Sequence, residues 1–220
     1  MFKDRIDAGK KLAEKLKELN LENPVVVALP RGGIPVGVEI AKELNAPFDI
    51  LFVKKIPSPT NEEVAIGSVS ENGLVFVNKK TIDFLALRGI NIDEEYIQQK
   101  AMEKIQEIAR QREKYKIEPI MLEGKDVIIV DDGIATGASM YLAANTIIRD
   151  MPKSIIIAAP VAPKDEELMN MLKQVSSKVV ILEQPENFMS VGQWYEDFHQ
   201  LSDKEVKEYL EEVKNLNKEK

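Results

Sequence analysis

Apolar residues along the chain follow two alternating patterns, namely short β-branched runs and longer stretches with helical spacing. A strand that is covered on both faces is apolar at successive positions, so the short runs predict buried strands. These runs lie at 25–29, 48–53, 127–130, 154–159 and 178–182, and the stretches between them predict helices near 34–44, 137–149 and 164–175. Strands that alternate with helices indicate an α/β fold with a mostly parallel sheet flanked by helices.

The ends and the middle of the chain carry three further helical patterns. The segment from Asn91 to about residue 115 predicts a long helix, because Asn91 and Glu94 have capping-box spacing before an apolar stripe. Ser202 and Glu205 predict the start of a C-terminal helix by the same spacing. An opening amphipathic helix is predicted by apolar residues near helical spacing, namely Phe2, Ile6, Leu12, Leu16 and Leu19.

The segment between the second strand run and the long helix has a different character. Residues 54–67, KKIPSPTNEEVAIG, contain two prolines and mixed charges, which predict a long mobile loop that runs into a strand. Within it, residues 55–64 are a candidate lid. The apolar runs on either side of Glu71-Asn72-Gly73 predict a β-hairpin, because Asn-Gly is the strongest short signal for such a turn.

One domain is the simplest organisation for these elements. The 220 residues are enough to bury a substantial core, and the chain has no internal repeat and no low-complexity linker. We therefore expect a single domain over residues 1–220, with a core at about 24–182. A hood segment and the C-terminal helix are expected at about 183–216.

Composition narrows the class of protein and its partners. Hydrophobic residues make up 44% and charged residues 30% of the chain, which is typical of a soluble globular protein. With no apolar run near the roughly 20 residues that span a bilayer and no signal-peptide pattern, we expect a cytoplasmic protein without a membrane partner. The net charge of −7 argues against a nucleic-acid partner.

Two residue types that often carry chemistry are scarce. The chain has no cysteine, which rules out disulfides and thiolate metal sites and agrees with a cytosolic location. His199 is the single histidine, so a multi-histidine zinc site and a histidine-dependent triad are both disfavoured.

The stretch VIIVDDGIATGAS, residues 127–139, carries the main chemical signal. Asp131 and Asp132 follow a predicted buried strand, so they lie at the edge of the sheet where ligands of α/β proteins bind. The small-residue loop after them leads into a helix whose free N–H groups and dipole favour a phosphate, with Thr136 and Ser139 as further donors. Two carboxylates beside a phosphate cradle suit a ligand such as ribose 5-phosphate.

Alternative roles for the small-residue loops have less support. An Asp-Gly hairpin turn would be followed by alternation, whereas helical spacing follows here. Asp132 or Thr136 as a plain helix cap remains open. A Walker A loop fails because Val38 and Glu39 stand where lysine and serine or threonine are required, and the chain has no GxGxxG for a dinucleotide.

These residues resemble a known family. VIIVDDGIATGAS resembles the 5-phosphoribosyl-1-pyrophosphate (PRPP) motif of type I phosphoribosyltransferases, ALPRGGIPVG their pyrophosphate loop, and KKIPSPTNEEVAIGSV their flexible catalytic loop. The likeness runs from about residue 24 to about residue 160. It is nearest to a branch of unassigned substrate that continues into FMSVGQWYEDF. The resemblance implies the type I fold, with a hairpin and flexible loop and a C-terminal hood.

The resemblance also implies roles for particular residues. Asp131 and Asp132 would hold the ribose hydroxyls and contribute, directly or indirectly, to a Mg²⁺ site. Arg31, Gly32 and Gly33 would bind pyrophosphate bridged by Mg²⁺, with a non-proline cis peptide between Pro30 and Arg31. The 5-phosphate cradle would comprise Ala135, Thr136, Gly137 and Ser139, and Gly133 and Ile134 would be further PRPP-binding residues of the motif.

The catalytic step implied by the resemblance needs cations and a dry site. Arg31 with Lys54 or Lys55 would stabilise the departing pyrophosphate, while the lid excludes water from the cation-like sugar. Paired lysines at a solvated strand end are the structural alternative. Glu62 and Glu63 are interpreted as solvated loop charges.

Recognition of the acceptor base is the least defined part of the resemblance. Ala135 stands where 6-oxopurine enzymes carry an aspartate, which argues against hypoxanthine or guanine as the base. Phe188 is the candidate for stacking on the base. Trp194 and Phe198 are expected to pack the hood against the body of the protein.

The sequence thus predicts a Mg²⁺-dependent transfer of phosphoribose from PRPP to a nitrogenous base or related acceptor, with release of pyrophosphate. This would place the protein in nucleotide metabolism, and the resemblance implies a homodimer. An alternative is a regulatory protein that senses PRPP or a nucleotide without catalysis. A third is a protein that only binds or hydrolyses a sugar phosphate.

Overall fold

The computed structural model describes residues 1–218, and these form two compact units. The first comprises Met1–Leu51 and the chain from Ile117 onward, and the second comprises Phe52–Lys116. The last two residues of the predicted domain lie outside the described part of the chain. That both units belong to one domain stays a prediction, and each unit is considered by itself below.

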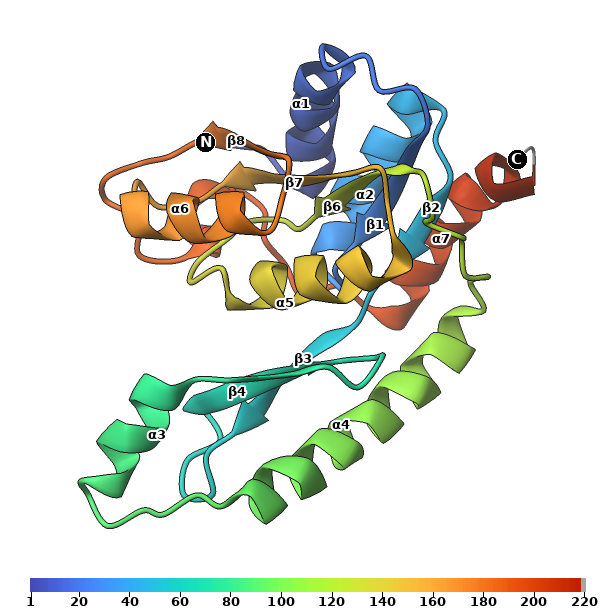
Figure 1. Cartoon of the computed structure of the whole chain (residues 1–220). Helices are drawn as coiled ribbons and strands as arrows, with labels where there is room; N and C mark the ends of the chain where they lie inside the picture. Colours follow the sequence, from blue (N-terminus) through green and yellow to red (C-terminus); the bar gives the residue numbers. More distant parts are fainter. Residues whose placement is uncertain (219–220) are drawn as a thin grey trace. The chain divides into compact units, whose positions relative to one another are not determined.

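A five-stranded parallel sheet forms the centre of the first unit (Figure 1). β6 is buried along its whole length, as expected for a β-branched run with helices on both sides. The strands, in order across the sheet, are β2 (Phe48–Ile50), β1 (Pro24–Ala28), β6 (Asp126–Val130), β7 (Ser154–Val161) and β8 (Lys178–Glu183).

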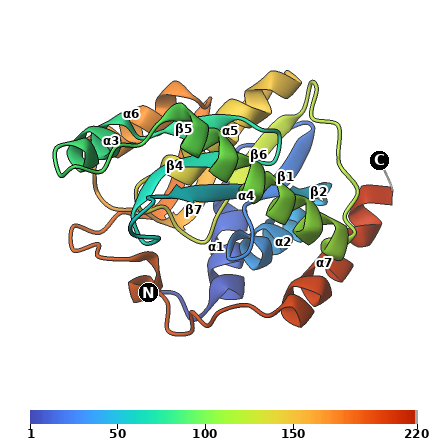
Figure 2. The ribbon, with the colours of Figure 1, turned by 90° about the horizontal axis from the view of Figure 1, so that it is seen from below.

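Helices cover both faces of this sheet. On one face α1 (Arg5–Lys17) packs on α2 (Gly33–Leu44), which also packs on α7 (Asp203–Lys218). The other face carries α5 (Ala138–Ile147) and α6 (Glu166–Gln174), as Figures 1 and 2 show together. A short 3₁₀ turn, η1 (Ile148–Asp150), follows α5. A second, η2 (Val191–Trp194), lies in the hood segment. The parallel α/β fold is confirmed.

The order of the strands creates a switch point between β1 and β6. From β1 the chain passes through α2 to β2 on one side, whereas β6 pairs with β1 on the other side. Ala28 at the end of β1 is paired with Val130 at the end of β6. The loops that follow these strands therefore leave the sheet side by side, which is where ligands of open α/β sheets bind.

The second unit is an antiparallel sheet with two helices. β4 pairs with both β3 and β5, and Gly73 takes a φ of +84° in the turn between β4 and β5, so the predicted hairpin is confirmed. Ala101 and Leu85 of the helices are buried in one core with Ile56 of the sheet. The elements are β3 (Val53–Pro57), β4 (Ala65–Ser70), β5 (Val75–Val77), α3 (Lys79–Ala86) and α4 (Glu94–Tyr115).

Two sequence predictions need correction, and one helix was not predicted. The single strand at 48–53 is wrong, because β2 ends at Ile50 and β3 begins at Val53 in a different sheet. The loop predicted from residue 54 begins only at Ser58, since the preceding residues of β3 pair with β4. The patterns also gave no sign of α3. An apolar run indicates that its residues are buried but not which strand they pair with. One run can therefore contribute strands to two different sheets.

The ends of two helices also differ from the prediction. α4 begins at Glu94, and the cap is Asp93, whose carboxylate accepts from the Tyr96 N–H at 2.8 Å, rather than Asn91. α1 begins at Arg5, so Phe2 lies before the helix. The capping box before α7 is confirmed, because Ser202 and Glu205 exchange side chain to backbone hydrogen bonds at 3.2 Å.

The cap of α4 supplies a test of the fold. Asp93→Ala should lower the free energy of unfolding by about 1 kcal/mol, because it removes the acceptor for a free N–H of the first turn. Asn91→Ala is the matched control and should leave the stability within about 0.5 kcal/mol, since Asn91 is an exposed residue outside the helix. Urea unfolding of both variants measures the difference, and an equal or larger effect at Asn91 would contradict the assignment.

Candidate active site

The loops after β1 and β6 lie in direct contact at the switch point. The Leu29 N–H donates to the Val130 carbonyl at 3.0 Å. A Cβ atom on Gly32 would lie 1.9 Å from Asp132 Oδ2, and one on Gly33 would lie 2.8 Å from the Val130 carbonyl oxygen. Only glycine permits this approach. The structure therefore brings the residues 30–33 predicted for pyrophosphate against the acidic pair, and the expected cis peptide between Pro30 and Arg31 is present.

The loop from Gly133 to Gly137, predicted as the phosphate cradle, leads directly into α5. Gly137 takes a φ of +81°, and a Cβ there would lie 2.4 Å from Leu168 Cδ1, so the turn requires glycine. Thr136 Oγ1 accepts from the Ala138 N–H at 3.3 Å. The first N–H groups of a helix have no carbonyl partner within it, so the start of α5 presents donors and a positive potential.

The two carboxylates lie close together in a largely buried setting, which disfavours their charged forms. Burial raises the pKa of Asp131 well above its usual value, and the negative charge of Asp132 raises it further. Asp131 Oδ1 accepts from the Asp132 N–H at 2.8 Å, which orients the first carboxylate. Burial also raises the pKa of Asp132, against the opposing effect of Arg5. Hydroxyl donors or a cation would stabilise this pair.

Comparison with known proteins agrees with this geometry. A family model described as the phosphoribosyl transferase domain matches residues 2–190. The chain belongs to this family. Relatives provisionally named as phosphoribosyl transferases, from the CDC 1551 and H37Rv strains of Mycobacterium tuberculosis, are 36% identical over 213 residues. The alignment covers 96% of this chain and 46% of each relative, so the chain spans about half the length of the curated relatives it matches.

One solved structure is similar to this chain over nearly its whole length. The crystal structure of TT1426 from Thermus thermophilus superposes with a TM-score of 0.77 at 35% identity. The match covers 96% of this chain and 97% of that one. The parallel sheet flanked by helices, expected from the sequence as the type I fold, is confirmed.

Arg5 is a residue of the site that the sequence patterns did not reveal. Its Nε donates to Asp132 Oδ2 at 3.1 Å, and the two side chains are only 10% and 14% exposed. A signal was nevertheless present in the sequence. Arg5 lies three and seven positions before Ala8 and Leu12, which places a charge on the buried face of α1. A charged residue in an apolar stripe indicates a buried partner.

The predicted catalytic cations have different surroundings. The Arg31 guanidinium donates to the Leu201 carbonyl at 2.7 Å and pairs with Asp203, so its side chain reaches the start of α7. Lys54 and Lys55 lie on β3 of the second unit. Lys54 Nζ is 3.2 Å from Glu107 Oε2 of α4, and Lys55 is exposed.

The aromatic side chains of the hood pack against other residues of the first unit. Trp194, Phe198 and Phe188 surround a buried cluster that contains Phe2 and Tyr195, so the packing role expected for the first two is confirmed. The Tyr195 hydroxyl donates to the Asp132 carbonyl at 2.5 Å. Burial raises the pKa of this hydroxyl, which keeps it protonated as a donor.

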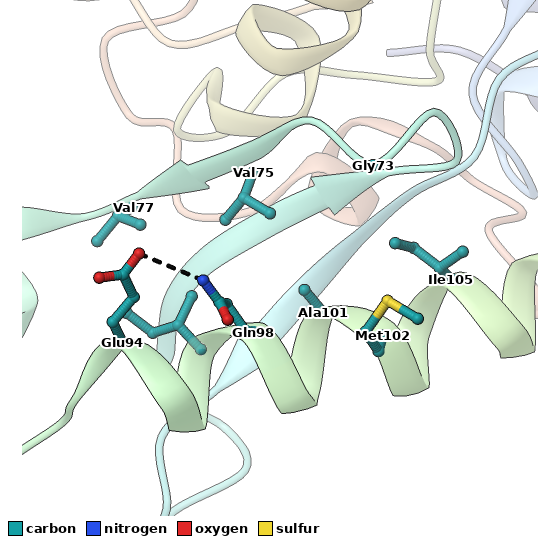
Figure 3. A pocket seen from close by; sticks show the side chains of 9 residues that line it. Gly73, Val75, Val77, Glu94, Gln98, Ala101, Met102 and Ile105 are labelled. Atoms are coloured by element: carbon teal, nitrogen blue, oxygen red, sulfur yellow. Dashed lines mark hydrogen bonds between the residues drawn. The ribbon is translucent and has the colours of Figure 1, made fainter.

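A separate cavity of about 500 Å³ lies within the second unit, between the hairpin and α4 (Figure 3). Apolar side chains such as Val75 and Ile105 line most of it, and Gln98 donates to Glu94 at 3.3 Å near one end. Its lining, drawn from the described residues, contains none of the residues predicted for PRPP and no cationic side chain. The cavity is therefore unsuited to phosphate.

The described residues, 1–218, contain neither a membrane-spanning helix nor a cluster of metal-binding side chains. No helix in this part of the chain is both long and apolar enough to cross a membrane. No group of three or more histidine, cysteine, aspartate or glutamate side chains there is arranged to hold a metal ion.

Two aspartates near opposite ends of β6 should respond in opposite ways to amide substitution. Because the pKa of Asp131 is raised in the folded state, the folded protein loses stability as pH rises above about 4, the usual value. Asp131→Asn should therefore raise the melting temperature at pH 7.5 by roughly 2–4 °C.

Asp126→Asn is the matched control for this effect. Burial acts to raise the pKa of Asp126, but hydrogen bonds from Ser154 and Asn23 outweigh it and lower the pKa, so its charge stabilises the fold at neutral pH. This variant should melt at a lower temperature. Thermal unfolding in EDTA, which removes divalent cations, measures both variants. Destabilisation by Asp131→Asn would contradict the electrostatic account.

Proposed function

We propose that the protein transfers phosphoribose from PRPP to a nitrogenous acceptor and releases pyrophosphate. The observation that carries this proposal is the contact between two loops at the switch point, where Gly32 lies against the Asp132 carboxylate and the start of α5 follows. A sugar phosphate with a second phosphate group at its other end matches an acidic pair placed between two phosphate-binding loops.

Each part of PRPP has a matching part of the site. Asp131 and Asp132 accept hydrogen bonds from the ribose 2′- and 3′-hydroxyls, which relieves the repulsion between the two carboxylates. The N–H groups of Ala135, Thr136, Gly137 and Ser139, with the Thr136 and Ser139 hydroxyls, bind the 5-phosphate. The glycines of residues 30–33 let the backbone approach the pyrophosphate.

In the reaction, the bond between ribose C1 and the pyrophosphate oxygen breaks and a bond from the acceptor nitrogen to C1 forms. Positive charge develops on the sugar ring, and Asp131 and Asp132 stabilise it from nearby. Negative charge develops on the leaving group. Arg31 is the proposed cation for that charge, because its pair with Asp203 is about one-third exposed and exchanges readily with an anionic ligand.

A magnesium ion fits the donor groups of this site. Mg²⁺ is usually held by one or two carboxylates together with substrate phosphates and waters, rather than by a cage of protein ligands. Asp131 and Asp132 supply the carboxylates, and Gly32 and Gly33 place no side chain between them and a phosphate. When bound, the ion supplies positive charge that neutralises the pyrophosphate.

The acceptor is proposed to be a base other than a 6-oxopurine. Ala135 is exposed at the position where 6-oxopurine enzymes carry an aspartate, so that position offers no carboxylate to bind such a base. Phe188 is half-buried in the hood and is the proposed stacking residue.

A non-catalytic sensor of PRPP or a nucleotide is the second candidate. One observation favours it: the Arg31 guanidinium already has an internal carboxylate partner, Asp203. A site that binds PRPP without needing to stabilise a departing pyrophosphate could keep this pair closed.

Replacing both acids tests the PRPP site directly. The double variant Asp131→Asn/Asp132→Asn should bind Mg²⁺-PRPP at least roughly 100-fold more weakly, because charge-assisted hydrogen bonds contribute about 1.5–3 kcal/mol each. Asp150→Asn, at an exposed position in η1, is the control and should bind as the native protein does. Calorimetric titration measures the affinity, and unchanged binding in the double variant would remove the acids from the proposal.

Catalysis is tested separately by pyrophosphate release with a panel of purine and pyrimidine bases. Pyrophosphate release with one base supports the transferase. Faster release with hypoxanthine or guanine than with the other bases would contradict the role given to Ala135. Tight binding of PRPP with no release for any base would favour the sensor.

A further inference from the structure

The Arg5 guanidinium is held on three sides by different parts of the first unit. Its Nε donates to Asp132 Oδ2 at 3.1 Å, and its Nη1 donates to the His199 carbonyl at 2.8 Å. The guanidinium carbon lies 4.0 Å from the centre of the Phe198 ring. One side chain thus contacts a carboxylate proposed for ribose and two neighbouring residues of the hood.

The N-terminal segment that carries Arg5 is itself joined to the hood. The Phe2 N–H donates to the Trp194 carbonyl at 2.9 Å, and the Glu196 N–H donates to the Phe2 carbonyl at 2.8 Å. Asp4 caps α1 by accepting a hydrogen bond from the backbone of its first turn, which sets where the helix begins and hence where Arg5 points. Backbone pairing therefore places the guanidinium between the acids and the hood.

We propose that Arg5 is a positioning residue that couples Asp132 to the hood, so that binding of ribose at the acidic pair is transmitted to residues 194–199. The inference rests on the proposed function for its ligand. A planar guanidinium donates in fixed directions from several nitrogens and stacks on an aromatic face at the same time. Lysine can neutralise Asp132 but cannot maintain all three contacts.

Simple stabilisation is a poor explanation of this ion pair. The two side chains are almost buried, and the cost of removing both charges from water offsets much of their attraction. The contacts with His199 and Phe198 are not needed to neutralise Asp132. They give the guanidinium a single orientation, which in turn orients the carboxylate that is proposed to receive a ribose hydroxyl.

The chain contains its own reporter for this coupling. Trp194 is the single tryptophan, and it lies in η2 immediately before Tyr195. Its indole Nε1 is buried and has no hydrogen-bond partner among the described residues. Loosening of the hood would expose this ring, which acrylamide quenching of its fluorescence detects.

The test is a double-mutant cycle on the ligand-free protein, with Asp132→Ala, Arg5→Lys and the double variant. Each single change should raise the Trp194 quenching constant about twofold, and the double variant should match the singles, because both changes break the same connection. Additive effects, or no change in Arg5→Lys, would overturn the proposal. Arg5→Gln replaces Arg5→Lys if the latter does not fold, as judged by circular dichroism.

A matched control comes from an ion pair elsewhere in the first unit. Lys42 Nζ lies 2.9 Å from Glu212 Oε1 and joins α2 to α7. Lys42→Gln should leave the quenching of Trp194 unchanged. An effect as large as that of Arg5→Lys would show general loosening and would also overturn the proposal.

A titration with Mg²⁺-PRPP separates this inference from the proposed function. The native protein should change its Trp194 emission on binding. Arg5→Lys should bind within about tenfold of the native affinity, since the charge is kept, yet lose the emission change. Absence of PRPP binding to the native protein would refute the proposed function, while the ligand-free cycle still decides the coupling. If the native protein binds PRPP but the effects of the two changes on Trp194 quenching are additive, the coupling is refuted and the proposed function is not.

Discussion

The site depends on the adjacency of two carboxyl ends in one parallel sheet. Because β1 and β6 are neighbours, the loops that follow them leave the sheet together, and each leads to the start of a helix. This topology places a glycine of one loop against a carboxylate of the other, as Gly32 lies against Asp132. The backbone that leads into two helices and an acidic pair thus meet without any long side chain between them.

Burial of the two aspartates opposes their ionisation. Asp131 and Asp132 raise the free energy of the folded chain when both are ionised, which the elevated pKa of each expresses. Arg5 offsets part of this cost at Asp132, and the Asp132 N–H offsets part of it at Asp131. Hydroxyl donors or a cation beside the two carboxylates would relieve the remaining repulsion.

Much of the chemistry could be predicted from the chain because it lies in contiguous motifs. VIIVDDGIATGAS indicates a buried strand, two acids, a small-residue loop and a helix, and the structure has each of these in that order. The hairpin at Gly73 and the capping box at Ser202 were equally local. Such features are set by φ preferences, side chain to backbone hydrogen bonds and apolar periodicity, which act over a few residues.

The contacts that complete the site join residues far apart in the chain, so only the tertiary structure decided them. Arg5 and Asp132 are 127 positions apart, and Arg31 and Leu201 are 170 apart. The split of residues 48–53 between two sheets belongs to the same class, because it depends on which strand each half pairs with. The sequence by itself determined most of the strands, the two small-residue loops and the acids that follow β6. The folded chain decided which charges face one another, since pairing and burial arise from distant segments rather than local preference.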